Sequence, residues 1–402
     1  MAHDAHVPLL IIGAGPAGLS LATALARQGQ ASTIIETQSR DAVAAPAEDG
    51  RDIALTHRAR AILEDLGLWQ RLPPDVIAPL RAARVHDGGT PVALPFDAPP
   101  NTADGVLGWL VPNHHLRQVA WDAASTDPLI EIRTGAQVTA LELQAGAGIV
   151  RLQDGSTIGA DLVVAADSRY SGTRRLAGIG ADWLDFGRTA IVCRMTHERA
   201  HDSVAHECFN YGLTLAMLPM AGQQVSAVLT LKSNLVPEWL GLSPAAFAER
   251  IESRFGPHLG HLTLAGPRHS YPLVATYAHQ FHAQHFALLG DAAVGMHPVT
   301  AHGFNFGLYG VQVLVRELVE ARRRGQGLAS PAALAAYDRE HRRVTRPIFL
   351  GTNAIVQLFT DDRAPARLAR RAVVEIARRL PPVQAFITHQ LTGGARSRTG
   401  RP

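Results

Sequence analysis

The sequence has almost no lysine, almost no cysteine and no long apolar run. Lys232 is the only lysine, so arginine supplies nearly all of the 38 basic residues. We interpret this preference as a nucleotide-composition bias of the source and infer no function from the arginine content. The formal net charge is only +3, and the body of the chain has no long basic run. Nucleic-acid binding is therefore not expected.

Cys193 and Cys208 are the only cysteines, and they fit no metal-ligand spacing. Two thiols in a chain of 402 residues are typical of a reduced protein in which each thiol is a small buried hydrophobe. The apolar run at 7–12 is short and lacks the basic leader of a signal peptide. No stretch approaches the roughly eighteen apolar residues that cross a bilayer. We therefore expect a cytoplasmic protein.

The composition and the first forty residues indicate a globular enzyme with a dinucleotide site. The chain is 47% hydrophobic and 18% charged, and it is long enough for two domains. Residues 7–37 have the pattern of a strand, a glycine turn, an Ala/Leu-rich helix and a second strand.

The glycine turn is Gly13-Ala14-Gly15-Pro16-Ala17-Gly18. Gly13 allows the tight turn, Gly15 lets a pyrophosphate approach, and Gly18 lets helix and strand pack closely. Glu36 ends the second strand, where a carboxylate accepts hydrogen bonds from a ribose 2′-OH and repels a 2′-phosphate. The pattern favours FAD or NAD over NADP.

A second cofactor signal lies at 288–308. A short buried strand leads into Gly290-Asp291, then a His-Pro turn, then Gly303-Phe304-Asn305 at the start of a helix. Small residues after an Asp let the backbone approach a diphosphate and a sugar, and a helix N-terminus offers free N–H groups. Because enzymes that bind NAD alone need no second site of this kind, an extended FAD fits better.

Between these signals the pattern changes to a sheet. Residues 80–96 are expected to form a hairpin, and segments 188–196, 204–209, 213–218 and 224–232 an antiparallel meander. Helices are expected at 54–69, 303–323, 331–359 and 364–379.

Several motifs together resemble the flavoprotein aromatic hydroxylases of the p-hydroxybenzoate hydroxylase superfamily, most closely the branch that hydroxylates ubiquinone precursors. The similarity covers nearly the whole chain. It rests on GAGPAG at 13–18, RDIAL at 51–55, DSRYS at 167–171 with Arg174, GLTLAMLP at 212–219, YPL at 271–273, and LGDAA at 289–293 with His297-Pro298.

The resemblance implies an α/β fold, α+β overall: a glutathione-reductase-like FAD-binding Rossmann domain with an inserted antiparallel-sheet substrate domain and C-terminal helices. It implies that NAD(P)H reduces FAD and that a flavin C4a-hydroperoxide hydroxylates an electron-rich ring. The implied division is an FAD domain of 1–73, 98–180 and 270–330, a substrate domain of 74–97 and 181–269, C-terminal helices over 331–391, and a disordered tail over 392–402.

The resemblance also implies cofactor contacts. Gly13, Gly15, Gly18 and Glu36 hold the adenosine half, and Asp291 binds the ribitol. The other implied FAD contacts are Arg51 and Asn113 at the flavin half, Asp167, Gly290, Pro298, and Gly303, Phe304 and Asn305 at the pyrimidine edge.

Three departures from the family pattern stand out. Asp167-Ser168 replaces the usual Asp-Gly, and Tyr309-Gly310 replaces the usual Arg-Asp. Residues 297–303, HPVTAHG, replace the usual His-Pro-x-x-Gly-Gln-Gly. They are similar to a divergent subgroup linked to the demethoxyubiquinone step.

Two histidines and a tyrosine are candidates to assist the chemistry. A phenol with a pKa of about 10 reacts better when partly deprotonated, so a nearby base would help. His302 is the first candidate by position, with His57 and Tyr211 behind it. A loop histidine that hydrogen bonds to backbone is the alternative for His302. The histidines at 279–285 lie beside no carboxylate cluster, so no metal site is expected.

The arginine-rich segment 363–380 has the pattern of a basic amphipathic helix. It predicts contact with the inner face of a membrane, while a solvated helix or one that faces another quinone-biosynthesis protein is the alternative. Two other functions stay open beside a ubiquinone-precursor hydroxylase. One is a flavin hydroxylase of a soluble aromatic metabolite, and the other is a low-turnover flavoprotein scaffold of a quinone-biosynthetic complex.

Overall fold

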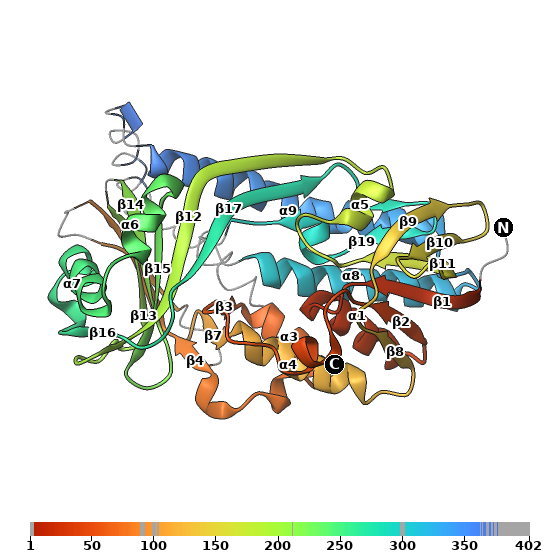
Figure 1. The fold of residues 1–402 in the computed structure, drawn as a ribbon, viewed down its shortest axis with the longest axis horizontal. Helices are drawn as coiled ribbons and strands as arrows, with labels where there is room; N and C mark the ends of the chain where they lie inside the picture. Colours follow the sequence, from red (N-terminus) through yellow and green to blue (C-terminus); the bar gives the residue numbers. More distant parts are fainter. Residues whose placement is uncertain are drawn as a thin grey trace.

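The computed structural model describes residues 4–88, 93–98, 102, 104–210, 212–297 and 302–361, with single positions between 363 and 376. Two large sheets lie at opposite ends of an elongated molecule, and the long strands β12 (Ala181–His197) and β17 (His269–Ala278) run between them (Figure 1). This mixed architecture confirms the expected α/β class.

The first sheet has eight strands with a parallel centre. Six of them follow the order β18-β19-β11-β1-β2-β8, and β10 pairs with β11 and with β9. β1 forms parallel pairs with β11 and β2, and its residues 9–12 are buried apolar side chains, as expected for a parallel strand covered on both faces. The strands are β1 (Ala5–Ile12), β2 (Ser32–Ile35), β8 (Ile130–Arg133), β9 (Val138–Leu143), β10 (Gly148–Leu152), β11 (Thr157–Ala165), β18 (His282–Ala283) and β19 (Phe286–Leu288).

Helices pack around this sheet and complete the larger core. Leu19, Leu21 and Leu25 of α1 are almost fully buried, as are Val313 and Leu314 of α8. The helices are α1 (Pro16–Ala26), α2 (Arg40–Ala44), α3 (His57–Asp65), α4 (Asn113–Ser125), α5 (Gly172–Leu176), α8 (His302–Arg323) and α9 (Pro331–Thr360).

A small three-stranded sheet, β3-β7-β4, lies between the two large ones. Its strands are β3 (Asp52–Leu55), β7 (Gly108–Pro112) and β4 (Ala78–Leu80). The expected helix at 54–69 is therefore wrong at its start. Residues 52–55 pair with β7, and the Thr56 hydroxyl accepts a hydrogen bond from the Ala59 N–H, which starts α3 only at His57.

The second large sheet has nine strands in the order β20-β17-β12-β15-β14-β13-β5-β6, with β16 beside β12. All its pairs are antiparallel except β13 with β5. The expected hairpin is present as β5 and β6. The remaining bounds are β5 (Ala82–Asp87), β6 (Leu94–Asp97), β13 (Val204–Asn210), β14 (Leu213–Pro219), β15 (Gln224–Lys232), β16 (Leu262–Leu264), β20 (Val294–Gly295), α6 (Val236–Leu240) and α7 (Pro244–Phe255).

The C-terminal part begins with α9, a single helix that continues through Pro347. The expected helix at 364–379 lies mostly, and the tail at 392–402 entirely, outside the described residues. Among the residues that the structure describes, no helix is both long and apolar enough to cross a membrane.

Candidate functional site

The glycine turn after β1 uses its three glycines for three different purposes. Gly13 has φ +109°, and a Cβ there would lie 2.6 Å from the Ala166 carbonyl oxygen. A Cβ on Gly18 would lie 2.1 Å from the Gly13 carbonyl oxygen, so α1 packs directly on the turn. A Cβ on Gly15 would meet nothing within 4 Å. Gly15 thus marks open space at the start of α1.

Glu36 fixes the rim of this turn. It is buried at the end of β2, where its Oε2 accepts the Ala14 N–H at 2.7 Å and its Oε1 accepts the Gln38 N–H at 2.8 Å. No side chain caps α1 at Gly15. Uncapped N–H groups beside open space suit a diphosphate, and a carboxylate at the rim suits a ribose, so this region fits FAD.

The second motif, far along the chain, lies against the first. Gly290, with φ +60°, opens the 3₁₀ turn Gly290–Ala292, and a Cβ on it would lie 3.0 Å from the Cβ of Ala17. Asp291 on the same turn accepts a hydrogen bond from Arg169 Nη2 at 3.0 Å. A Cβ on Gly303 would lie 3.9 Å from Asp291 Oδ1. The starts of α1 and α8 therefore meet at the 290–292 turn.

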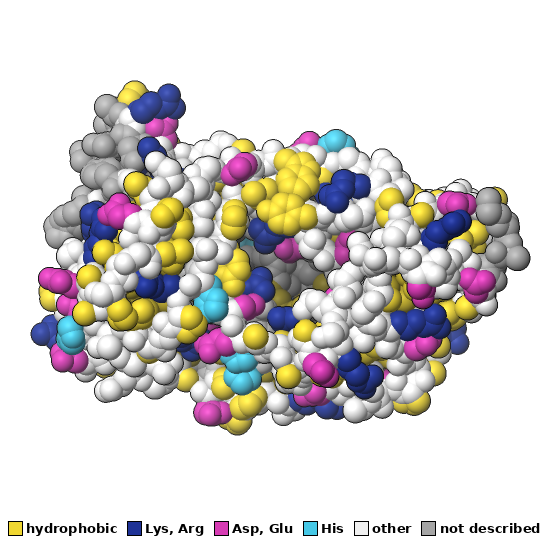
Figure 2. All heavy atoms as spheres, viewed as in Figure 1, with side chains coloured by type: hydrophobic (Ala, Val, Ile, Leu, Met, Phe, Trp, Pro, Cys, Tyr) yellow, Lys and Arg dark blue, Asp and Glu magenta, His cyan; other side chains and the backbone are white. Residues whose placement is uncertain are grey.

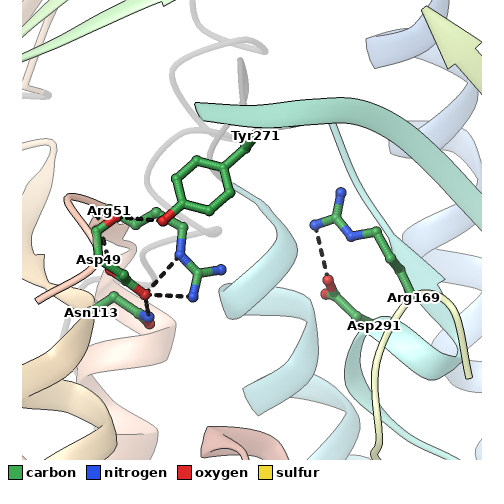
Figure 3. A network of polar contacts seen from close by, with 6 residues as sticks. All are labelled: Asp49, Arg51, Asn113, Arg169, Tyr271 and Asp291. Atoms are coloured by element: carbon green, nitrogen blue, oxygen red, sulfur yellow. Dashed lines mark hydrogen bonds and ion pairs between the residues drawn. The ribbon is translucent and has the colours of Figure 1, made fainter. Parts of the chain in front are cut away.

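A polar cluster lies on the other side of the start of α8 (Figure 3). Asp49 Oδ2 accepts hydrogen bonds from Arg51 Nη2 at 2.6 Å and Asn113 Nδ2 at 2.8 Å. The Tyr271 hydroxyl donates to the Asp49 carbonyl at 2.6 Å. Burial by itself would raise the pKa of Asp49, but the hydrogen bonds and charge of Arg51 outweigh it and lower that pKa. Because Tyr271 comes from β17, this cluster joins the two halves of the molecule.

Asn305 connects the start of α8 to the segment before α3. Its Oδ1 accepts the Thr56 N–H at 3.0 Å, and its Nδ2 donates to the Ala54 carbonyl at 2.8 Å. Phe304, next to it, is partly buried and packs against the core. Asn305 thus fastens α8 to the β3–α3 segment, while Pro298 lies outside the described residues.

Asp167 is placed beside the glycine turn but is engaged in its own loop. Its Oδ1 accepts the Ser171 hydroxyl at 2.5 Å and its Oδ2 accepts the Thr173 N–H at 3.2 Å. Its Cα would lie 2.9 Å from a Cβ on Gly13. Asp167 therefore shapes the wall of the turn, and a direct contact with FAD stays a prediction.

The three catalytic candidates are placed differently. His302 is the buried first residue of α8, with its ring 5.2 Å from that of Phe306. His57 Nε2 lies 3.0 Å from the Val106 carbonyl, which can only accept, so this nitrogen carries a proton and is not a free base. Tyr211 lies outside the described residues. In the described part of the chain, no group of three or more His, Cys, Asp or Glu side chains could hold a metal ion.

Several residues of the site were not predicted from the sequence. Arg169 belongs to the motif DSRYS at 167–171, and Tyr271 belongs to the motif YPL at 271–273. These motifs could have indicated that both side chains lie at the site. Asp49 had no signal beyond its closeness to Arg51. The buried pair of Arg194 Nη2 and Asp52 Oδ1, 2.6 Å apart, connects β12 to β3 and depends on tertiary contacts.

The surface is hollowed between the two large sheets, with basic and acidic side chains around the rim (Figure 2). Tyr271 of the nine-stranded sheet hydrogen bonds to Asp49, and Asn305 of α8 hydrogen bonds to Thr56 and Ala54. A cofactor on the glycine turns and a substrate on the nine-stranded sheet would therefore be neighbours.

Comparison with known proteins agrees with this arrangement. The model of the FAD binding domain family matches residues 6–349. The chain is 40% identical to ubiquinone hydroxylase UbiM of Neisseria meningitidis, over 96% of this chain and 85% of that protein. It is 38% identical to ubiquinone hydroxylase UbiL of Rhodospirillum rubrum, over 96% of this chain and 90% of that protein.

The fold is similar to that of p-nitrophenol 4-monooxygenase PnpA of Pseudomonas putida, with a TM-score of 0.77 at 17% identity, over 98% of this chain and 100% of that one. The family resemblance inferred from the motifs is confirmed. The chain belongs to the FAD binding domain family, in the group that contains the ubiquinone hydroxylases.

Proposed function

We propose that this protein is an FAD-dependent monooxygenase that uses NAD(P)H and O2 to hydroxylate the electron-rich ring of a prenylated ubiquinone precursor. The observation that carries the proposal is the meeting of the glycine turn, the 290–292 turn and the start of α8 opposite one face of the nine-stranded sheet. The ubiquinone hydroxylases UbiM and UbiL, similar along nearly the whole chain, support the substrate class.

The residues that would hold FAD follow from their positions. Gly15 and the first turn of α1 would take the diphosphate, and Glu36 the adenine-side ribose. Asp291 would take the ribitol, and Arg51 and Asn113 would approach the flavin half from the polar cluster of Figure 3. The start of α8, at Gly303, would aim its N–H groups at the negative charge of a reduced ring.

The chain's own part in the reaction is to bind, orient and exclude water. FAD, when bound and reduced by NAD(P)H, supplies the activated oxygen. Tyr271 fixes the nine-stranded sheet, and Asn305 fixes the start of α8, by hydrogen bonding to main-chain atoms of residues 49–56. Ala190, Val192 and Leu273 form a buried apolar cluster of the nine-stranded sheet, against which Tyr271 packs, and it would help to keep water from the reacting ring.

We further propose that FAD and substrate are divided between the two large sheets, with the division of the chain given above. The protein would work in the cytoplasm at the inner face of the membrane, which segment 363–380 would contact to receive a prenylated substrate. Liposome co-sedimentation of the full chain and of a chain ending at residue 361 tests this contact, and equal pelleting of both would contradict it.

Quinone profiling of a deletion strain tests the proposed function. The strain should lose ubiquinone and accumulate a precursor that lacks one ring hydroxyl, whose position names the carbon attacked. Unchanged ubiquinone would favour a soluble aromatic substrate. Full rescue by a variant that no longer binds FAD would favour the scaffold role.

A further inference from the structure

The nine-stranded sheet has two faces with different neighbours. One face carries Cys193, Cys208 and Leu215, which pack in a single apolar cluster with Phe247 and Ile251 of α7. Side chains alternate along a strand, so the residues between them point to the opposite face. Tyr271 and Arg194 lie on that opposite face, and they reach Asp49 and Asp52 beside the candidate FAD site. We call it the cofactor-side face.

Glu207 of β13 lies on the cofactor-side face, because its neighbour Cys208 packs toward α7. The residues paired with it across the strands are Val85 on β5 and Ala216 on β14, and both are apolar. Within the described residues, Glu207 makes no hydrogen bond or ion pair. Glu207 nevertheless keeps part of its surface accessible, so a ligand could reach it.

The two ends of the cofactor-side face are covered, which leaves the row of Glu207 between them. At one end the Phe209 ring lies 4.4 Å from Phe359 near the end of α9. At the other end Leu218 packs with Ala78 and Leu110 of the three-stranded sheet. Between these two contacts lies the row of Val85, Glu207 and Ala216, in which Glu207 is the one carboxylate.

No cation in the described part of the chain compensates Glu207. The charged or titratable side chains on the same face are Asp87, Arg188, Arg194, Lys232 and His269. Arg194 is paired with Asp52, and Arg188 donates to the Thr360 carbonyl at 2.6 Å. Burial raises the pKa of Glu207 to about 8, so at neutral pH its carboxyl group is mostly protonated and can both donate and accept a hydrogen bond.

We propose that Glu207 is the polar anchor of the substrate pocket: its carboxyl group hydrogen bonds to an oxygen substituent of the aromatic ring and sets which ring carbon faces the flavin. This inference rests on the proposed function for the identity of the ring. It explains why a carboxyl group that has no partner among the described residues stands between two apolar neighbours, Val85 and Ala216, since such a group is costly unless a ligand satisfies it.

The test compares two ligands on the FAD-loaded protein: a phenol with one ring-attached isoprene unit, and the same compound without the hydroxyl. Loss of one hydrogen bond in a pocket typically changes affinity about tenfold. Wild type should therefore bind the phenol about tenfold more tightly in a flavin-fluorescence titration. Glu207→Leu should bind both ligands equally, whereas Glu207→Gln, which keeps a donor and an acceptor, should retain most of the preference.

The exposed Glu249→Leu on α7 is the matched control and should behave as wild type. Glu207→Leu should also oxidise NAD(P)H with more hydrogen peroxide and less hydroxylated product, at unchanged FAD content. Equal preference in Glu207→Leu and wild type, or no preference in wild type, would overturn the proposal. Absence of any hydroxylated product from wild type would reject the proposed function instead, because the binding comparison does not require turnover.

Discussion

Gly15→Ala separates cofactor binding from folding more cleanly than any other change in the glycine turn. Gly15 has φ −75°, which alanine adopts freely, and the new Cβ would meet nothing within 4 Å. The free energy of unfolding of the FAD-free protein should change by no more than about 1 kcal/mol. If a diphosphate occupies the open space, the methyl overlaps it at a cost of about 1–3 kcal/mol. The Kd for FAD should then rise roughly tenfold to a hundredfold.

Gly18→Ala is the contrasting variant. Its Cβ would lie 2.1 Å from the Gly13 carbonyl oxygen, so α1 and the turn must move apart and the protein itself should be destabilised. Urea unfolding of both variants without added FAD, followed by titration of the FAD-free protein with FAD, separates the two effects. An unchanged Kd in Gly15→Ala would refute the placement of the diphosphate at this turn.

Further predictions concern the buried pair and the rim of the glycine turn. Arg194→Met leaves the Asp52 carboxylate buried without its cation, so the free energy of unfolding should fall by about 3–5 kcal/mol at pH 8 and by less at pH 5, as urea unfolding would show. Burial raises the pKa of Asp52 from 3.8 to about 6, although the charge of Arg194 acts in the opposite direction. Asp52 therefore stays protonated to a higher pH in the folded state than in the unfolded state. Wild-type stability should therefore drop by about 3 kcal/mol as the pH rises from about 4 to 6, and Asp52→Asn should flatten this drop; an identical pH profile in the variant would contradict it. Glu36→Gln removes an anionic acceptor at constant size, so FAD titration should show about tenfold weaker binding, and an unchanged Kd would exclude Glu36 from the site.

The fold could be predicted well where the sequence pattern is local. The apolar run of β1, the glycine turn and the strand ending at Glu36 specify a βαβ unit by themselves, and the strands of the meander follow from alternation. The parallel pairing of β5 with β13 could not be predicted, because it joins segments more than a hundred residues apart without a pattern of its own. The sequence pattern assigns the end of β3 to a helix, because a strand of four residues is too short to distinguish the strand period of about 2 residues from the helix period of about 3.6.

The same distinction between local and long-range features holds for the residues of the candidate site. Gly13, Gly18 and Gly290 belong to short motifs whose geometry is local, and the structure brings these motifs together. The ion pair of Arg194 with Asp52 joins two different sheets, so neither sequence segment indicates the other. The face of Glu207 could be assigned only from the register of three strands, because its own strand, VAHECFN, mixes apolar and polar residues.

Isotope labelling tests the central claim most directly. Purified protein with FAD, NAD(P)H, the singly prenylated phenol and 18O2 should yield a ring-hydroxylated product that contains one 18O atom per molecule, detected by mass spectrometry. A product without the label, or oxidation of NAD(P)H that yields hydrogen peroxide alone, would contradict a monooxygenase that acts on this ring.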